Sequence, residues 1–300
     1  MKRGQALLAS CALLLAGCGG ASGPETTTAT DDANGEGEVI LIDAGEEPRQ
    51  LLAYSLEKGD SARNSMRMKT EQSTISDGVS LGNTGFVMSY DIEATVTDSH
   101  SGRQTISFAY EDAHIATPGL TRAREERVAA RSGFPGNLPR EVVVDEQGRL
   151  LNGAQVLSDA ARTAPGTTVA QLTPGNVPFP DEEIGLGARW EVVDRIGFDD
   201  LRTEQTSTYT LEEITGEVYR LSVEQAGDLS GEIEGSELTG GELNGNGGIV
   251  GNLSRPLPVF TKLAGDTSMD FVVPRADGDV DATSVTQTKI VSGANGGEAG

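Results

Sequence analysis

The chain contains few histidines, the side chains most often used for acid–base catalysis. Its two histidines are His100 and His114. Asp98, Ser99 and His100 are consecutive, so a carboxylate, a hydroxyl and an imidazole stand together in the sequence. Side chains that are adjacent in sequence rarely converge as a catalytic triad requires, and no oxyanion-hole motif accompanies them. We therefore predict that the protein is not an enzyme, with His114 a solvated residue at the end of a strand.

The sequence also gives little sign of a metal or cofactor site. Residues 277–281 (DGDVD) resemble the opening of a calcium-binding loop, but the sixth position is Ala282 and the twelfth is Thr288, where an EF-hand has Gly and Glu. A weak adventitious calcium site on this acidic loop is the alternative left open. The glycines of residues 240–251 lack the spacing of a phosphate-binding loop and are interpreted as hairpin glycines. We predict no metal site and no cofactor.

Cys18 is the residue whose context is most informative. A basic start at residues 1–3 precedes the apolar run of residues 6–16, which is the pattern of a secretory signal. The following Leu-Ala-Gly-Cys sequence resembles the lipobox of bacterial lipoproteins. The resemblance implies cleavage between Gly17 and Cys18, with residues 1–17 removed as a signal peptide and lipid, including palmitate, attached to Cys18. An ordinary cleaved signal with a chance cysteine is the alternative.

A lipidated Cys18 has consequences for the rest of the chain. Several acyl chains on one residue hold a protein stably on a membrane. The other cysteine, Cys11, leaves with the signal, so the mature body has no thiol for disulfides, nucleophilic catalysis or metal binding. Gly19 stands where the inner-membrane retention signal of enteric bacteria has Asp, which favours an outer membrane. Residues 18–37 are predicted to be a lipidated, flexible tether that spans about 24 Å.

The composition describes an acidic protein with many turns. Acidic residues number 46 against 23 basic ones, which gives a formal net charge of −23. Nucleic acid and anionic membrane surfaces would repel such a body, so neither is expected as a partner. The chain has 39 glycines and only 4% aromatic residues, which suits a β protein with many short connections.

Alternation of apolar and polar residues predicts a predominantly β fold. In residues 86–98, Phe86, Met88 and Tyr90 begin a run of period two, and residues 104–114 return with the same period after a turn. These two segments predict an antiparallel hairpin. Further β segments are expected at residues 38–43, 49–57, 62–76, 140–151, 189–195, 201–214, 218–226, 229–238, 267–273 and 280–291, with a turn-rich ribbon at residues 240–251.

Two short helices are expected between the β segments, at residues 121–132 and 153–163, within a central insert of about residues 118–166. The predicted fold is mainly β, with a curved antiparallel sheet arranged as an open half-barrel or as two β halves. The β domain is predicted to cover residues 38–292, with a disordered tail at residues 293–300.

Several motifs together resemble an uncharacterised family of bacterial lipoproteins with a domain of unknown function. They are the lipobox, the polar hairpins, the small hairpin at residues 145–148, and the Pro-rich residues 174–180 that lead into Gly185, Gly187 and Trp190. The layout is also similar to the half-barrel lipoprotein carriers of the LolA- and LppX-like class. That similarity implies a hydrophobic concave face that can hold lipid.

Three functions follow as hypotheses. The first is a lipid-anchored protein of the cell envelope that binds a lipid or another apolar ligand on its concave sheet. The second is a structural or partner-binding lipoprotein, with an unknown envelope partner, and the third is an enzyme. Trp190 is interpreted as a core anchor, with ligand stacking as the alternative. The candidate ligand-facing residues of the first hypothesis are Met66, Met68, Phe86, Met88, Tyr90, Phe108 and Tyr219.

Overall fold

The computed structural model describes residues 37–132, 138, 140–152, 177–198, 201–233, 236–273 and 278–294. The predicted signal peptide, the cleavage site at Gly17 and Cys18, and the tether up to residue 36 lie outside the described residues. The same is true of the second predicted helix, at residues 153–163, and of residues 295–300 in the predicted tail. These predictions stay predictions.

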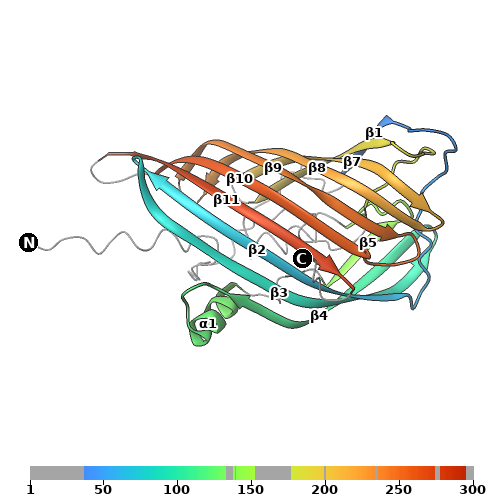
Figure 1. Ribbon diagram of the computed structural model, residues 1–300, viewed down its shortest axis with the longest axis horizontal. Coiled ribbons are helices and arrows are strands. Elements are labelled where there is room, and N and C mark those ends of the chain that lie inside the picture. Colours follow the sequence, from blue (N-terminus) through green and yellow to red (C-terminus); the bar gives the residue numbers. More distant parts are fainter. Residues whose placement is uncertain are drawn as a thin grey trace, which may run out of the picture.

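The described chain forms one antiparallel sheet of eleven strands (Figure 1). The strand order is β1-β6-β7-β8-β9-β10-β11-β2-β3-β4-β5. The strands are β1 (Glu38–Asp43), β2 (Ser61–Ser76), β3 (Val79–His100), β4 (Arg103–Ala116), β5 (Glu141–Asp145), β6 (Arg189–Phe198), β7 (Leu201–Thr215), β8 (Val218–Ile233), β9 (Ser236–Asn252), β10 (Phe260–Val273) and β11 (Val280–Gly293).

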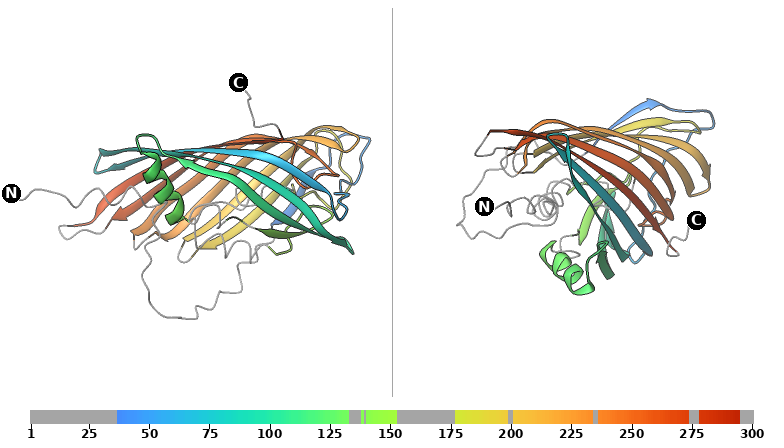
Figure 2. Two further views of the ribbon diagram at one scale, coloured as in Figure 1. Left: turned by 90° about the horizontal axis from the view of Figure 1, so that it is seen from below. Right: turned by 60° about the vertical axis from the view of Figure 1, so that its left-hand side comes forward.

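The sheet is open, because β1 and β5 form its two edges and do not pair with each other. It curves strongly around one side (Figure 2). The mainly β, curved antiparallel fold is therefore confirmed. Of the two predicted arrangements, the continuous open sheet is the one observed, because the pairing of β11 with β2 joins the strands before the insert to those after it.

The concave face carries the core, and the alternating sequence pattern explains why. In the register of β2 and β3, Met66 lies opposite Tyr90 and Met68 lies opposite Met88, so these side chains share one face. On β3 every second side chain from Tyr90 to Val96 is buried, whereas the intervening side chains are exposed or half-buried. The same face continues on β4 through the buried Ile106 and Phe108.

Three loops cover one end of the concave face. Residues 44–60 were expected to contain a strand at 49–57, which is wrong: this stretch is an extended loop with one isolated β-bridge, between Gln50 and Ile184. Separate backbone hydrogen bonds also hold it, such as that from the Tyr54 N–H to the Glu146 carbonyl at 2.6 Å. The loop still buries alternate side chains, namely Leu52, Tyr54 and Leu56. Residues 177–188 and 253–258 supply the remaining cover, with the buried residues Val177, Phe179, Ile184, Ala188, Leu253 and Leu257.

An aromatic cluster joins these loops to the sheet. The Phe179 ring lies 5.2 Å from that of Tyr219, in an edge-on arrangement, and 5.8 Å from that of Trp190, measured between centroids. Trp190 stacks on Tyr209 with centroids 5.5 Å apart. Its Nε1–H donates to the Pro178 carbonyl at 2.8 Å, so the indole is fully buried with its polar atom satisfied. Trp190 is a core anchor, as the sequence suggested.

Two other sequence expectations are wrong. Residues 240–251 are not a turn-rich ribbon, because they lie within β9 in the middle of the sheet. Their glycines make room for neighbours: a Cβ on Gly251 would collide with the Tyr219 ring, and one on Gly247 would collide with the Lys262 carbonyl. The weak strand at residues 229–238 is instead the end of β8 and the start of β9.

The described part of the insert contains one helix, α1 (Arg122–Ser132), which closely matches the predicted range. It follows β4 and lies beside that end of the strand (Figure 1). Glu125 in its first turn accepts a hydrogen bond from the Thr117 backbone N–H at 2.8 Å. Among the described residues, no helix combines the length and the apolar character that crossing a membrane would require.

Candidate ligand-binding cavity

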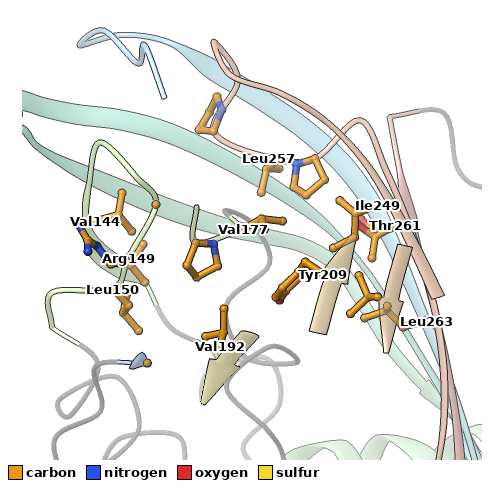
Figure 3. A pocket seen from close by; sticks show the side chains of 18 of the residues that line it. Val144, Arg149, Leu150, Val177, Val192, Tyr209, Ile249, Leu257, Thr261 and Leu263 are labelled. Atoms are coloured by element: carbon orange, nitrogen blue, oxygen red, sulfur yellow. The ribbon is translucent and has the colours of Figure 1, made fainter. Parts of the chain in front are cut away.

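A cavity of about 130 Å³ opens between the concave face and the covering loops. Side chains converge on it from both sides: Val192 and Tyr209 from the sheet, and Leu257 from a covering loop (Figure 3). Most of the lining is apolar. The apolar lining residues are Met66, Ile106, Phe108, Val142, Val144, Leu150, Val177, Pro178, Val192, Tyr209, Val223, Ile249, Pro256, Leu257, Pro258, Leu263 and Ile290.

Two polar lining residues are already engaged by neighbouring groups. Arg149 forms a salt bridge with Asp145 at 2.7 Å and binds both carboxylate oxygens of Asp181, at 2.8 and 2.9 Å. Asn64 donates to the Pro258 carbonyl at 2.8 Å and accepts from Arg255 at 2.8 Å. These contacts hold the covering loops in place. They pair the Arg149 charge with two carboxylates and engage both the amide nitrogen and the amide oxygen of Asn64.

Asp194 on β6 is different. Its carboxyl group lines the cavity, and within the described chain it has neither a hydrogen bond nor a salt bridge. Burial disfavours the ionised form and raises the pKa of Asp194 to about 6. Its cross-strand partner is Gln205 on β7, a residue that is 1% exposed. Asp194 is therefore a half-buried carboxyl group with a raised pKa that lines an apolar cavity.

The structure places the seven predicted ligand-facing residues on the concave face but brings only two of them to the cavity. Met66 and Phe108 line it. The predicted contribution of the other five to ligand binding stays a prediction. Tyr90 and Tyr219 are buried in the core, whereas Met68, Phe86 and Met88 are half-buried further along β2 and β3.

Sequence reasoning missed the contributions of β6 to β8, including Val192, Val223 and Asp194. A signal for Asp194 was present, because it continues the period-two pattern of Trp190 and Val192 on the buried side of β6. An aspartate in such a position is a candidate for a buried carboxylate.

The residues first considered for chemistry lie elsewhere. His100 and His114 are both exposed, near opposite ends of β4. The Ser99 hydroxyl donates to the Leu56 carbonyl at 2.9 Å. Part of the calcium-like loop, including Asp277, lies outside the described residues. Within the described ranges, no group of three or more His, Cys, Asp and Glu side chains is arranged to hold a metal ion.

Comparisons with known proteins add no family to this picture. No family model matches the chain, and no curated protein matches its sequence. Among solved structures, it is similar to OccK9 (OpdG) of Pseudomonas aeruginosa, with 8% identity, a TM-score of 0.20, and coverage of 78% of this chain and 98% of that one. It is also similar to OccK11 (OpdR) of the same organism, with 8% identity and a TM-score of 0.19, and the match covers 81% of this chain and 100% of that one. Likenesses this weak support no argument about function.

Proposed function

We propose that the protein is a lipid-anchored, non-enzymatic protein of the cell envelope that binds an apolar ligand on its concave face. The observation that supports this proposal is the cavity of about 130 Å³ with its mainly apolar lining. A largely apolar concave site with a few polar groups is the common form of small-molecule sites in proteins.

The cavity volume limits what can be bound. An engineered apolar cavity of about 150 Å³ stays free of water and binds benzene. A cavity of similar size in this protein accommodates a small apolar molecule or the end of an acyl chain. The ligand is therefore a short apolar group, and a whole membrane lipid would leave most of its length outside the cavity.

The anchor belongs to the same proposal. Lipid on Cys18 would hold the body near a membrane, the outer membrane where the organism has one, and the tether after it would keep the sheet clear of the headgroups. The acidic body would not adhere to anionic lipid by itself, since the formal net charge is −23. The acyl chains would hold the protein at a membrane that its negative charge would otherwise repel.

A cavity-filling substitution tests ligand binding directly. Val223 on β8 lines the cavity and is 2% exposed, so Val223→Phe places a ring in the space. Val218→Phe is the matched control, because Val218 lies on the same strand and is 42% exposed. Titration calorimetry with octanol should give binding to the wild type and to the control but not to Val223→Phe. Equal binding by all three proteins would contradict the proposal, provided circular dichroism shows that all three are folded.

One observation favours partner binding as a second candidate function. Within the described chain, β1 pairs with β6 on one side only, and its other side is an open edge of the sheet. Ile40 and Ile42 on this strand are 38% and 52% exposed. An exposed edge with apolar side chains can accept a strand from another protein. Photocrosslinking from position 42 in intact envelopes tests this, and a specific partner should be lost in the Ile40→Lys variant.

A further inference from the structure

Two polar residues that line the cavity belong to a group of polar side chains that the proposed function does not yet use. This acceptor cluster consists of Asp194 on β6, Gln205 and Ser207 on β7, and Gln225 on β8. Asp194 is paired with Gln205 in the β6–β7 register, and Ser207 with Gln225 in the β7–β8 register. The four residues are therefore neighbours, and Asp194 and Gln225 both line the cavity.

Hydrogen bonds within the cluster leave acceptors unsatisfied. The Gln205 Nε2 amide donates to the Ser207 hydroxyl at 3.2 Å, and the Gln225 Nε2 amide donates to the same oxygen at 3.3 Å. The Gln205 Oε1 atom is buried and has no hydrogen-bond partner among the described residues. The half-buried Asp194 carboxyl group also has no hydrogen bond within the described chain. A buried acceptor without a donor is unfavourable, so the cluster is suited to a group that brings donors.

The basic side chains nearest to the cluster in sequence or in the cavity are engaged elsewhere. Arg195, the next residue on β6, forms a salt bridge with Glu204 at 2.8 Å. Arg149 is bound by two aspartates. Arg255 donates through Nη2 to Asn64 and to the Arg63 carbonyl, whereas its buried Nε has no hydrogen-bond partner among the described residues. Burial raises the pKa of Asp194, and no salt bridge to Asp194 is found within the described chain.

We infer that the cavity binds an amphipathic amine, with its aliphatic chain in the apolar part and its ammonium group bound by the Asp194 carboxylate and Gln205 Oε1. This inference rests on the proposed function, because it names the class of ligand for the same cavity. An ammonium group carries three donors and no acceptor, which matches a carboxylate beside an unsatisfied amide oxygen. A fatty acid would instead bring its carboxylate next to Asp194, and the two charges would repel.

The test compares three ligands with the same chain length. Octylamine, octanol and octanoate are titrated by calorimetry at neutral pH into the wild type and the Asp194→Asn variant. The control is Asp228→Asn, which makes the same chemical change at an exposed residue of β8. Octylamine should bind the wild type at least about tenfold more tightly than octanol, because hydrogen bonds to charged groups are the strong ones. Octanoate should bind most weakly.

Each variant separates the inference from the proposed function. Asp194→Asn should bring the affinities for octylamine and octanol to within a factor of about two of each other, and Asp228→Asn should keep the wild-type preference for octylamine. Gln205→Met, which removes the unsatisfied oxygen, should weaken octylamine binding several-fold more than octanol binding, because an ammonium group brings three donors and a hydroxyl only one. Octanol binding without any preference for octylamine, or a preference that survives Asp194→Asn, would overturn the inference alone. Failure of all three ligands to bind would overturn both the inference and the proposed function.

Discussion

Replacing Asp194 by Asn should stabilise the protein at neutral pH, although it alters a residue of the candidate site. The carboxyl pKa is raised from 3.8 to about 6 by burial, so the folded protein holds the proton more tightly than the unfolded chain does. At neutral pH the folded state must bury an ionised carboxylate. The pKa difference, at about 1.4 kcal/mol for each pH unit, corresponds to about 3 kcal/mol.

The expected gain on substitution is smaller than that value, because the amide is also a polar group that must be buried. We expect Asp194→Asn to raise the free energy of unfolding by about 1–3 kcal/mol near neutral pH. Most carboxyl groups have a lowered pKa in the folded state and stabilise it at neutral pH, whereas Asp194 does the opposite. Its unfavourable contribution to the free energy of unfolding is fully present above about pH 6 and disappears as the pH falls toward 4. The advantage of the variant should shrink over the same interval.

Urea unfolding of the wild type, Asp194→Asn and Asp228→Asn, followed by circular dichroism at several pH values, measures this effect. Asp228 is exposed on β8, so its variant corrects for the general removal of one negative charge. A variant that is less stable than the wild type at neutral pH would refute the reasoning. The same holds for an advantage that is unchanged between neutral and acidic pH, because burial of the charge would then not be its cause.

Three further predictions concern the core and the anchor. Tyr54→Phe should cost about 1–3 kcal/mol in urea unfolding, because the Tyr54 hydroxyl accepts from the Val177 N–H at 2.9 Å and bonds the Tyr219 hydroxyl at 2.8 Å. Gly251→Ala should lower the melting temperature, because the new Cβ would collide with the Tyr219 ring, whereas Gly248→Ala, with only a carbonyl oxygen at 3.4 Å, should not. Cys18→Ser should move the protein from the membrane to the soluble fraction, or leave its signal uncleaved, as fractionation and mass spectrometry would show.

Each of these predictions has a contrary outcome. Tyr219→Phe keeps the bond between Tyr54 and Val177, so it should cost less than Tyr54→Phe, and the reverse order would contradict the bonding described. Equal melting temperatures for the two glycine variants would show that the backbone of β9 adjusts to a side chain. A membrane-bound and fully processed Cys18→Ser protein would show that Cys18 is not the anchor.

The strands with one buried and one exposed face could be predicted, because apolar and polar residues alternate along them with a period of two. The alternation on β3 and β4 is of this kind. The same period misled at residues 49–57, where Leu52, Tyr54 and Leu56 are buried from an extended loop that lacks a strand partner along its length. Periodicity shows which face of an extended segment is buried and does not show whether a ladder of hydrogen bonds is present.

β9 could not be recognised, because its glycines carry no side chains to alternate. Gly247 and Gly251 are required by what packs against them, and those neighbours come from β10 and β8. Such a requirement follows only from the register between strands. Sequence statistics favour a turn for a run of this composition.

Only part of the candidate site could be found for a related reason. Met66 and Phe108 were accessible because they belong to strongly alternating strands. The position of Asp194 depends on β1 pairing with β6, in which Glu38 lies opposite Val193, far away in the sequence. An aspartate is usually exposed, and only this long-range pairing and the covering loops place it in a cavity.

Native mass spectrometry of the protein purified from its own envelope would detect both the lipid anchor and a bound ligand. We expect a polypeptide that begins at Cys18 and carries covalent acyl chains, together with a second, non-covalent apolar molecule that organic solvent extracts. The Val223→Phe variant should keep the acyl chains and lose the extractable molecule, while Val218→Phe should keep both. A wild-type protein with no extractable molecule, or one that Val223→Phe retains in full, would contradict the account.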